Sequence, residues 1–167
     1  MIGHHDIKKI LIKSPLWNEP VHVLLVGSPG SAKTLFLMEI IRSFRSCLFV
    51  VASNRTKAGL VNQLFERRPK FTLIDELEKM KKNDQTSLLH LMETGIIAET
   101  KIGRIRQIQV TSRVFATANS CKNIIEPLLS RFLVVEIQEY TFEEFREIAV
   151  MRLEKENVNE TSAVMIA

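Results

Sequence analysis

The chain of 167 residues has only two cysteines, Cys47 and Cys121, which lie far apart and in no metal-binding spacing. This spacing predicts free thiols of the kind found in a reducing compartment. The four histidines also form no pattern of metal ligands. These shortages argue against a disulfide framework and against a metal site built on cysteine or histidine.

Long apolar runs and targeting signals are missing as well. No apolar run approaches the ~20 residues that span a bilayer, and the first residues, Met1 to Asp6, lack the basic-then-apolar pattern of a secretory signal. We therefore expect a non-secreted protein of the cytoplasm or the nucleoid, without a membrane partner. The net charge of +4 permits an anionic partner but does not establish one, and the length fits one domain with a sizeable core.

The sequence does contain a glycine-bearing loop between an apolar run and a helical pattern. The run from Val21 to Gly27 predicts a buried strand, and it leads into Gly27-Ser28-Pro29-Gly30-Ser31-Ala32-Lys33-Thr34. The backbone N–H groups of such a loop bind a polyphosphate, so all eight residues are candidate contacts for ATP. Lys33 would contact the terminal phosphates, and the Thr34 hydroxyl would bind Mg²⁺.

Ala32 stands where glycine is usual before the lysine of such a loop. We expect the methyl group to be tolerated because Gly27 and Gly30 still supply the permissive backbone. An ordinary strand-to-helix turn is the alternative, which the Lys-Thr pair at this spacing disfavours.

A second half of an ATPase site follows the apolar run Phe71 to Ile74. Asp75 would hold Mg²⁺ through its water shell, and Glu76 would polarise the attacking water. An Asp-Glu pair alone is weak, because helices often begin with acidic residues. Its position after the phosphate loop strengthens the prediction.

Strands and helices alternate along the chain, which predicts an α/β fold with a five-stranded, mostly parallel sheet between helices. We expect strands at residues 21–27, 47–52, 71–74, 114–118 and 132–137. We expect helices at residues 6–13, 35–41, 56–66, 83–93, 124–130 and 141–157, with Asn83 or Asp84 capping the fourth and a Thr141/Glu144 capping box on the last. Residues 1–140 would form the core, and residues 141–167 the start of a lid.

Residues 95–110 alternate polar and apolar on either side of Gly103, which predicts an inserted β-hairpin. Lys101, Arg104 and Arg106 lie at its tip and in its second arm, and it contains no aromatic residue for base stacking. A lone hairpin is marginally stable, which favours a moving part. The alternative is an edge hairpin whose charges prevent aggregation, and the charge pattern leaves both open.

Together these stretches resemble the AAA+ ATPases of the presensor-1 hairpin branch, above all the replicative helicases of the minichromosome maintenance (MCM) family. The resemblance covers about residues 20–137 and rests on residues 27–34, 54–60, 73–80, 92–119 and 128–132. It implies a P-loop NTPase with an AAA+ core, the cofactors ATP and Mg²⁺, and a homo-oligomeric, hexameric ring that acts on DNA.

The resemblance also implies further site residues. Asn119 matches the sensor-1 asparagine, which would orient the attacking water, and Arg131 matches an arginine finger, which would reach the neighbouring subunit's nucleotide. Lys101 matches the hairpin lysine that would contact DNA, with Arg104 and Arg106 adding to it. The alternatives are a strand-end turn for Asn119 and a helix-capping surface arginine for Arg131.

The chain also departs from the MCM pattern. Residues 56–70 are too few for the second MCM hairpin, the long loop after the sensor-1 asparagine is missing, and no sensor-2 arginine follows the first lid helix. The chain is similar also to the branch-migration ATPase RuvB and to MoxR-type ATPases. A DNA helicase or translocase subunit is therefore our first expectation. A MoxR-type ATPase that remodels a protein client is the alternative, and a regulatory nucleotide-binding module is a third possibility.

Overall fold

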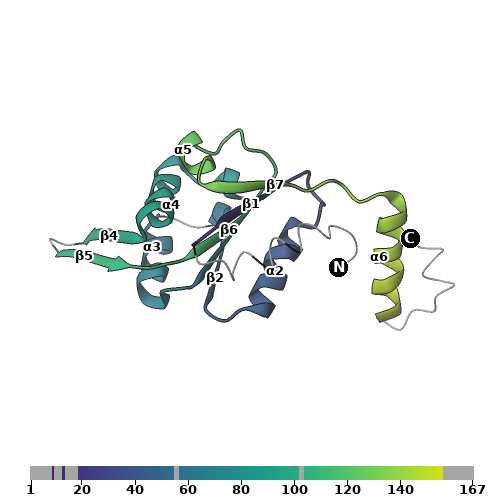
Figure 1. Cartoon of the computed structure of the whole chain (residues 1–167), viewed down its shortest axis with the longest axis horizontal. Coiled ribbons are helices and arrows are strands. Elements are labelled where there is room, and N and C mark those ends of the chain that lie inside the picture. The colour runs from purple at the N-terminus through teal and green to yellow at the C-terminus, as the bar shows by residue number, and fades with distance from the viewer. Residues whose placement is uncertain (1–8, 10–12, 14–18, 55–56, 102–103, 156–167) are drawn as a thin grey trace.

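The computed structural model describes residues 9, 13, 19–54, 57–101 and 104–155 (Figure 1). The expected helix at residues 6–13 and the turn at Gly103 fall almost entirely outside the described residues. Among the helices that are described, none is long and apolar enough to cross a membrane.

A five-stranded sheet forms the centre of the molecule, in the order β2-β3-β6-β1-β7. All four strand pairings in it are parallel, so the predicted α/β fold is confirmed. Val23, Leu24 and Leu25 of β1 are at most 1% exposed, as expected of a central parallel strand that is covered on both faces. The strands are β1 (His22–Val26), β2 (Cys47–Val51), β3 (Phe71–Asp75), β6 (Arg113–Ala118) and β7 (Phe132–Glu136).

Helices cover both faces of this sheet because successive side chains of each strand point to opposite faces. On one face, Phe36 and Leu37 of α2 pack with Val23 and Leu25 of β1. On the other face, α3, α4 and α5 pack against the alternate strand residues, such as Leu24. The helices are α2 (Lys33–Ser43), α3 (Lys57–Arg67), α4 (Lys82–Thr94), α5 (Glu126–Leu129) and α6 (Phe142–Lys155), with short 3₁₀ turns η2 (Ala52–Asn54) and η3 (Leu77–Lys79).

Helix α4 begins differently from the prediction. Its N-cap is Lys81, which makes no side-chain capping bond, whereas Asn83 and Asp84 lie inside the first turn. The predicted caps are therefore wrong. The buried residues Leu77 and Met80 anchor the preceding turn, so packing sets the start of this helix.

A fully buried glutamine ties α4 to the loop that follows β6. The Gln85 Nε2 group donates to the carbonyl oxygens of Met80 and Asn123, both at 2.9 Å, and its Oε1 accepts from the Ile125 N–H at 2.8 Å. A buried amide with such partners fixes the relative position of the segments that it joins. The sequence analysis missed this residue.

The predicted hairpin is confirmed as β4 (Ile96–Lys101) paired antiparallel with β5 (Arg104–Gln109). Gly95, with φ +67°, ends α4, and its carbonyl accepts from the Val110 N–H at 2.7 Å. Ile97 is buried in the core. Figure 1 shows the hairpin extending away from the sheet beyond α3 and α4.

Helix α6 starts with the predicted capping box. The Thr141 N–H donates to Glu144 Oε2 at 3.0 Å, and the Glu144 N–H donates to Thr141 Oγ1 at 3.2 Å. Figure 1 shows α6 standing apart from the sheet at the end of an extended segment. The division into a core and a lid stays a prediction.

A buried histidine makes the fold sensitive to acid. His22 is 6% exposed, and its Nδ1 accepts from the Val114 N–H at 3.0 Å. Burial, helped by the charge of Arg113, lowers its pKa from 6.5 to about 4, against a raising effect of a backbone hydrogen bond to Met92. The folded protein therefore holds His22 in the neutral form.

We predict that acid destabilises the protein through His22. As the pH falls from about 6.5 toward 4, His22 is protonated in the unfolded chain but stays neutral in the folded chain. The free energy of unfolding therefore falls by up to about 3 kcal/mol. Denaturant unfolding at about pH 7 and about pH 4.5 should show a clearly smaller loss in His22→Asn than in the wild type. Equal losses in both proteins would contradict the assignment.

Candidate functional site

The phosphate loop joins β1 to α2 at the carboxyl end of the sheet. Gly27 lies so close to the segment after β7 that a Cβ there would stand 2.5 Å from the Ile137 carbonyl oxygen. Its N–H donates to the Ala118 carbonyl at 3.2 Å. Close approach of the backbone therefore requires glycine at this position, whereas Gly30 adopts a left-handed φ of +88°.

Ala32 also adopts the left-handed conformation, with φ +60° and ψ 16°. Besides Gly30, Ala32 itself therefore supplies part of the unusual backbone that the sequence placed at Gly27 and Gly30. This conformation costs a residue with a Cβ about 1–2 kcal/mol. The surrounding loop sustains the strain, because Ala32 is the N-cap of α2 and its carbonyl accepts from the Leu35 N–H at 2.9 Å.

Lys33 lies inside the loop and is only 8% exposed. Its Nζ donates to the carbonyl oxygens of Gly27 at 2.9 Å and Ser28 at 2.6 Å, and to Ser31 Oγ at 3.2 Å. Burial lowers the pKa of Lys33, while Glu78 and Asp75 act in the opposite direction. The loop thus holds its cation at the centre of the predicted phosphate contacts.

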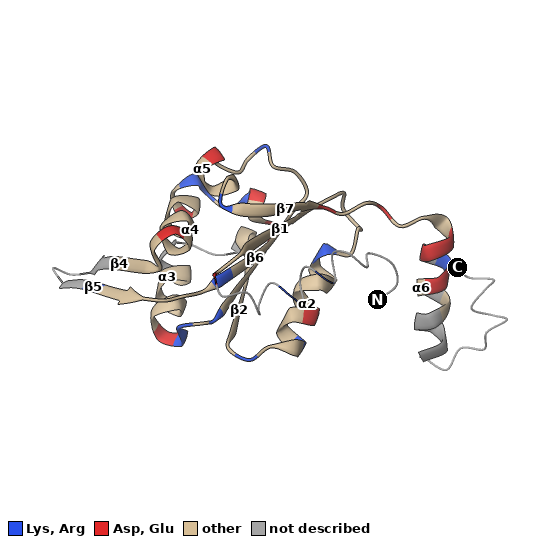
Figure 2. Ribbon diagram, viewed as in Figure 1, with Lys and Arg blue, Asp and Glu red and all other residues tan. Residues whose placement is uncertain are grey.

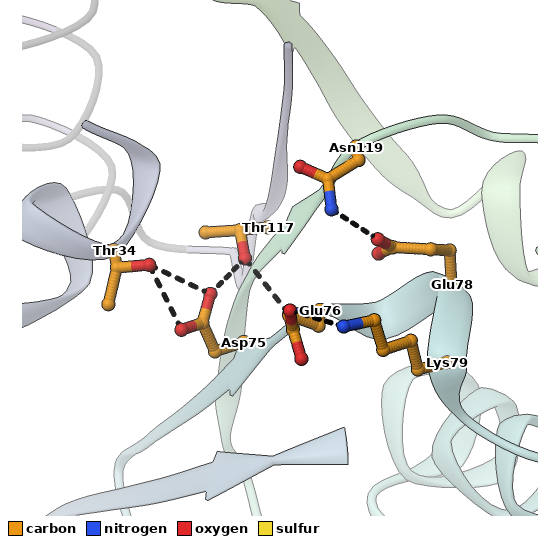
Figure 3. Close-up of polar contacts among 7 residues, drawn as sticks. All are labelled: Thr34, Asp75, Glu76, Glu78, Lys79, Thr117 and Asn119. Carbon is orange, nitrogen blue, oxygen red and sulfur yellow. Dashed lines mark hydrogen bonds and ion pairs between the residues drawn. The ribbon is translucent and has the colours of Figure 1, made fainter. Parts of the chain in front are cut away.

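The two predicted magnesium ligands, Thr34 and Asp75, lie in contact at the carboxyl end of the sheet (Figure 3). Thr34 Oγ1 donates to the Asp75 carboxylate at 3.0 and 3.2 Å. No group of three or more His, Cys, Asp or Glu residues suited to a metal occurs in the described part of the chain. A hydroxyl and a single carboxylate suit Mg²⁺, which keeps several waters and takes oxygens from the nucleotide phosphates.

Thr117 organises this acidic end of β3. Its Oγ1 donates to Asp75 Oδ1 and accepts from the Glu76 N–H at 3.1 Å, so one hydroxyl orients both acidic residues. Thr117 is 1% exposed, and the sequence analysis missed it. The available signal was a hydroxyl residue in an apolar strand, two positions before Asn119.

Two of the predicted catalytic side chains, those of Glu76 and Asn119, each bind a residue of η3. Glu76, which also has a left-handed φ of +60°, forms an ion pair with Lys79 Nζ at 2.6 Å. Asn119 Nδ2 donates to Glu78 Oε1 at 2.8 Å. Figure 3 shows both contacts beside the Asp75 and Thr117 cluster. The sequence analysis assigned no role to Glu78 or Lys79.

Three separate stretches of sequence line one cavity of about 330 Å³. Open α/β sheets bind ligands at this place, outside the carboxyl ends of their strands. The lining residues are Pro29, Gly30, Ser31, Ala32, Lys33, Thr34, Leu35, Asp75, Glu76, Thr117, Ala118 and Asn119.

Arg131 lies outside this cavity, between α5 and β7. Its Nε and one terminal nitrogen donate to Glu93 Oε1 of α4, at 3.0 and 2.7 Å. Its side chain is 52% exposed. The arginine therefore binds a carboxylate of α4 in its own subunit, which is not the helix-capping contact considered from the sequence.

The basic residues of the hairpin are only partly described. Lys101 and Arg104 face each other in the backbone register of β4 and β5, and their side chains lie outside the description. The Arg106 guanidinium lies over the Phe65 ring of α3, 4.7 Å from its centre, which ties the hairpin to the core. Figure 2 shows basic and acidic positions interspersed along the described core.

The chain matches the family model described as the MCM P-loop domain over residues 6–165. It is similar to the DNA replication licensing factor mcm2 of Xenopus laevis, with 27% identity over 90% of this chain and 20% of the relative. The mcm2 protein of Schizosaccharomyces pombe is 26% identical over 81% of this chain and 21% of its own length. The minichromosome maintenance protein MCM of Saccharolobus solfataricus is 23% identical over 88% and 27%. The chain thus spans about a fifth to a quarter of these relatives.

We predict that Thr117→Val weakens Mg²⁺-dependent nucleotide binding about tenfold, because Asp75 loses a donor and the Glu76 N–H loses its acceptor. Titration with a fluorescent ATP analogue, with Mg²⁺ and with a chelator, measures the effect. Thr72→Val is the matched control, since Thr72 is a buried threonine of β3 that shares a hydrogen bond with Ser112 Oγ at 2.8 Å and does not line the cavity. Equal losses in the two variants would contradict a specific role for Thr117.

Proposed function

Because the chain belongs to the MCM family, whose P-loop domain it matches over residues 6–165, we propose that it is the ATP-hydrolysing core of a DNA helicase or translocase subunit. The observation that carries the proposal is the single cavity shared by the phosphate loop, the Asp75-Glu76 pair and Asn119. Such a cavity collects the parts that phosphoryl transfer to water requires.

The residues present fit MgATP. The loop N–H groups and Lys33 would bind the phosphates, and Thr34 and Asp75 would hold Mg²⁺, which would neutralise negative charge on the phosphates. Thr117 keeps Asp75 oriented toward that position. Glu76 accepts the proton of the attacking water, and Asn119 orients that water.

Turnover requires Glu76 and Asn119 to leave their partners in η3. The Glu76 carboxylate is paired with Lys79, and the Asn119 amide with Glu78. The Lys79 side chain is 49% exposed, so water weakens its ion pair with Glu76 and can replace it.

Arg131 completes the site of a neighbouring copy. It does not line the cavity of its own subunit, and it lies half-exposed beside α5. An added arginine stabilises the charge of the transition state in many phosphoryl-transfer enzymes. Each subunit of a homo-oligomeric ring, proposed to be hexameric, would thus supply Arg131 to the next.

The hairpin supplies the contact with DNA. It projects from the core with Lys101 and Arg104 at its end, and it contains no aromatic residue. The contact is therefore to the phosphate backbone and largely independent of base sequence. The names of the relatives point to DNA replication, and neither the family match nor these names support the MoxR-type alternative.

We predict that DNA stimulates ATP hydrolysis and that the rate rises steeply with protein concentration.

Glu76→Gln should bind ATP without turnover, and Arg131→Ala should lose about 10³-fold in rate. Mixing the two variants should restore activity, because some interfaces then combine an intact Glu76 with an intact Arg131. A phosphate-release assay measures the rates, and titration with a fluorescent ATP analogue measures ATP binding by Glu76→Gln. Absence of rescue in a proven oligomer would contradict the trans role.

We also predict that Lys101→Ala weakens DNA binding and lowers the slope of log affinity against log salt by about 1. Fluorescence anisotropy with a labelled single strand at several salt concentrations measures this slope. Lys122→Ala is the control, because Lys122 is an exposed lysine outside the hairpin. An unchanged slope for Lys101→Ala, or an equal change in both variants, would contradict the assignment.

A further inference from the structure

The contact between Glu93 and Arg131 uses only part of the guanidinium. Nε and one terminal nitrogen both donate to Glu93 Oε1, at 3.0 and 2.7 Å. An arginine has five N–H donors in a rigid planar fork, so the other terminal nitrogen and the opposite edge stay available. Because the Arg131 side chain is 52% exposed, that edge can meet a second anion without breaking the first contact.

Glu93 stands at a helix end whose backbone is fixed. It is the penultimate residue of α4, and its side chain is 31% exposed. Beside it, Thr94 Oγ1 accepts from the Ile96 N–H at 3.0 Å, and the Gly95 N–H donates to the Leu91 carbonyl at 3.0 Å. These contacts fix the backbone from which Glu93 presents its carboxylate to Arg131.

We propose that Glu93 is a positioning residue, which holds Arg131 in the orientation from which it reaches the nucleotide of the neighbouring subunit. This inference rests on the proposed function, in which Arg131 acts in trans. The contact with Glu93 restricts the rotamers of Arg131 before it meets the phosphate. The entropy cost of ordering the arginine at the phosphate is therefore smaller. Glu93 does not line the cavity of its own subunit, so its effect would pass through Arg131.

The test compares the kinetics of Glu93→Ala, Glu93→Gln and Arg131→Ala in the full chain. Glu93→Ala should lower kcat about tenfold with an unchanged KM for ATP, because the phosphate loop of each subunit is intact. Glu93→Gln should retain part of the rate, since its amide oxygen still accepts from the guanidinium. The double variant Glu93→Ala/Arg131→Ala should be no slower than Arg131→Ala.

Subunit mixing separates positioning from a general structural defect. Glu93→Ala mixed with Glu76→Gln should regain rate per Glu76-bearing subunit, because an intact Glu93–Arg131 pair then serves an intact cavity. A defect in folding would stay with the altered subunit and would not be rescued. The melting temperature should stay within about 4 °C of wild type, as expected for an exposed pair. Glu126→Ala, at an exposed carboxylate of α5, is the matched control.

The possible failures are distinguishable. A normal kcat in Glu93→Ala beside a defective Arg131→Ala would overturn the positioning role and leave the proposed function standing. If Glu93→Ala loses its rate and mixing with Glu76→Gln does not restore it, the positioning role is likewise overturned and the proposed function stands. A wild-type rate in Arg131→Ala, or a chain without ATP turnover, would overturn the proposed function and this inference with it.

Discussion

The carboxyl end of the sheet depends on one buried hydroxyl. Thr117 of β6 bonds both the carboxylate of Asp75, the last residue of β3, and the N–H of Glu76, which follows β3. Thr34 of α2 also bonds the Asp75 carboxylate. The phosphate loop, the acidic residues and the strand that leads to Asn119 are thereby fixed to one another. Parallel pairing brings these strands side by side, and the hydroxyl contacts set the geometry within which the cavity forms.

The sequence predicted the fold well because its signals are local. Apolar runs of strand length alternate with helical patterns, and parallel strands that are covered on both faces leave little freedom in how such a chain packs. The capping box of α6 is equally local, since its two residues stand three apart. The start of α4 is not local, because buried Leu77 and Met80 decide it, and the prediction there was wrong.

The site could be predicted in its residue types but not in its contacts. Lys33, Thr34 and Asp75 lie in motifs whose spacing reflects their chemistry, and the structure brings them together. Thr117, Glu78 and Lys79 are partners of the proposed site residues. They become neighbours only through the pairing of β3 with β6 and the turn of η3. The left-handed backbone of Ala32 could not be predicted from the sequence, because a residue type does not specify its φ angle. The left-handed conformations of Ala32 and Glu76 place strain on two sides of one cavity.

Helix α4, through Gln85, links the hairpin to the segments that follow η3 and β6. Near one end of this helix, the buried amide of Gln85 bonds these segments. The other end passes through Gly95 directly into the hairpin. Thirteen helical residues span about 20 Å, and a helix is stiff along its axis. A displacement of the hairpin base would thus move the segments bound by Gln85 along the axis of α4, because the helix shifts as a rigid unit.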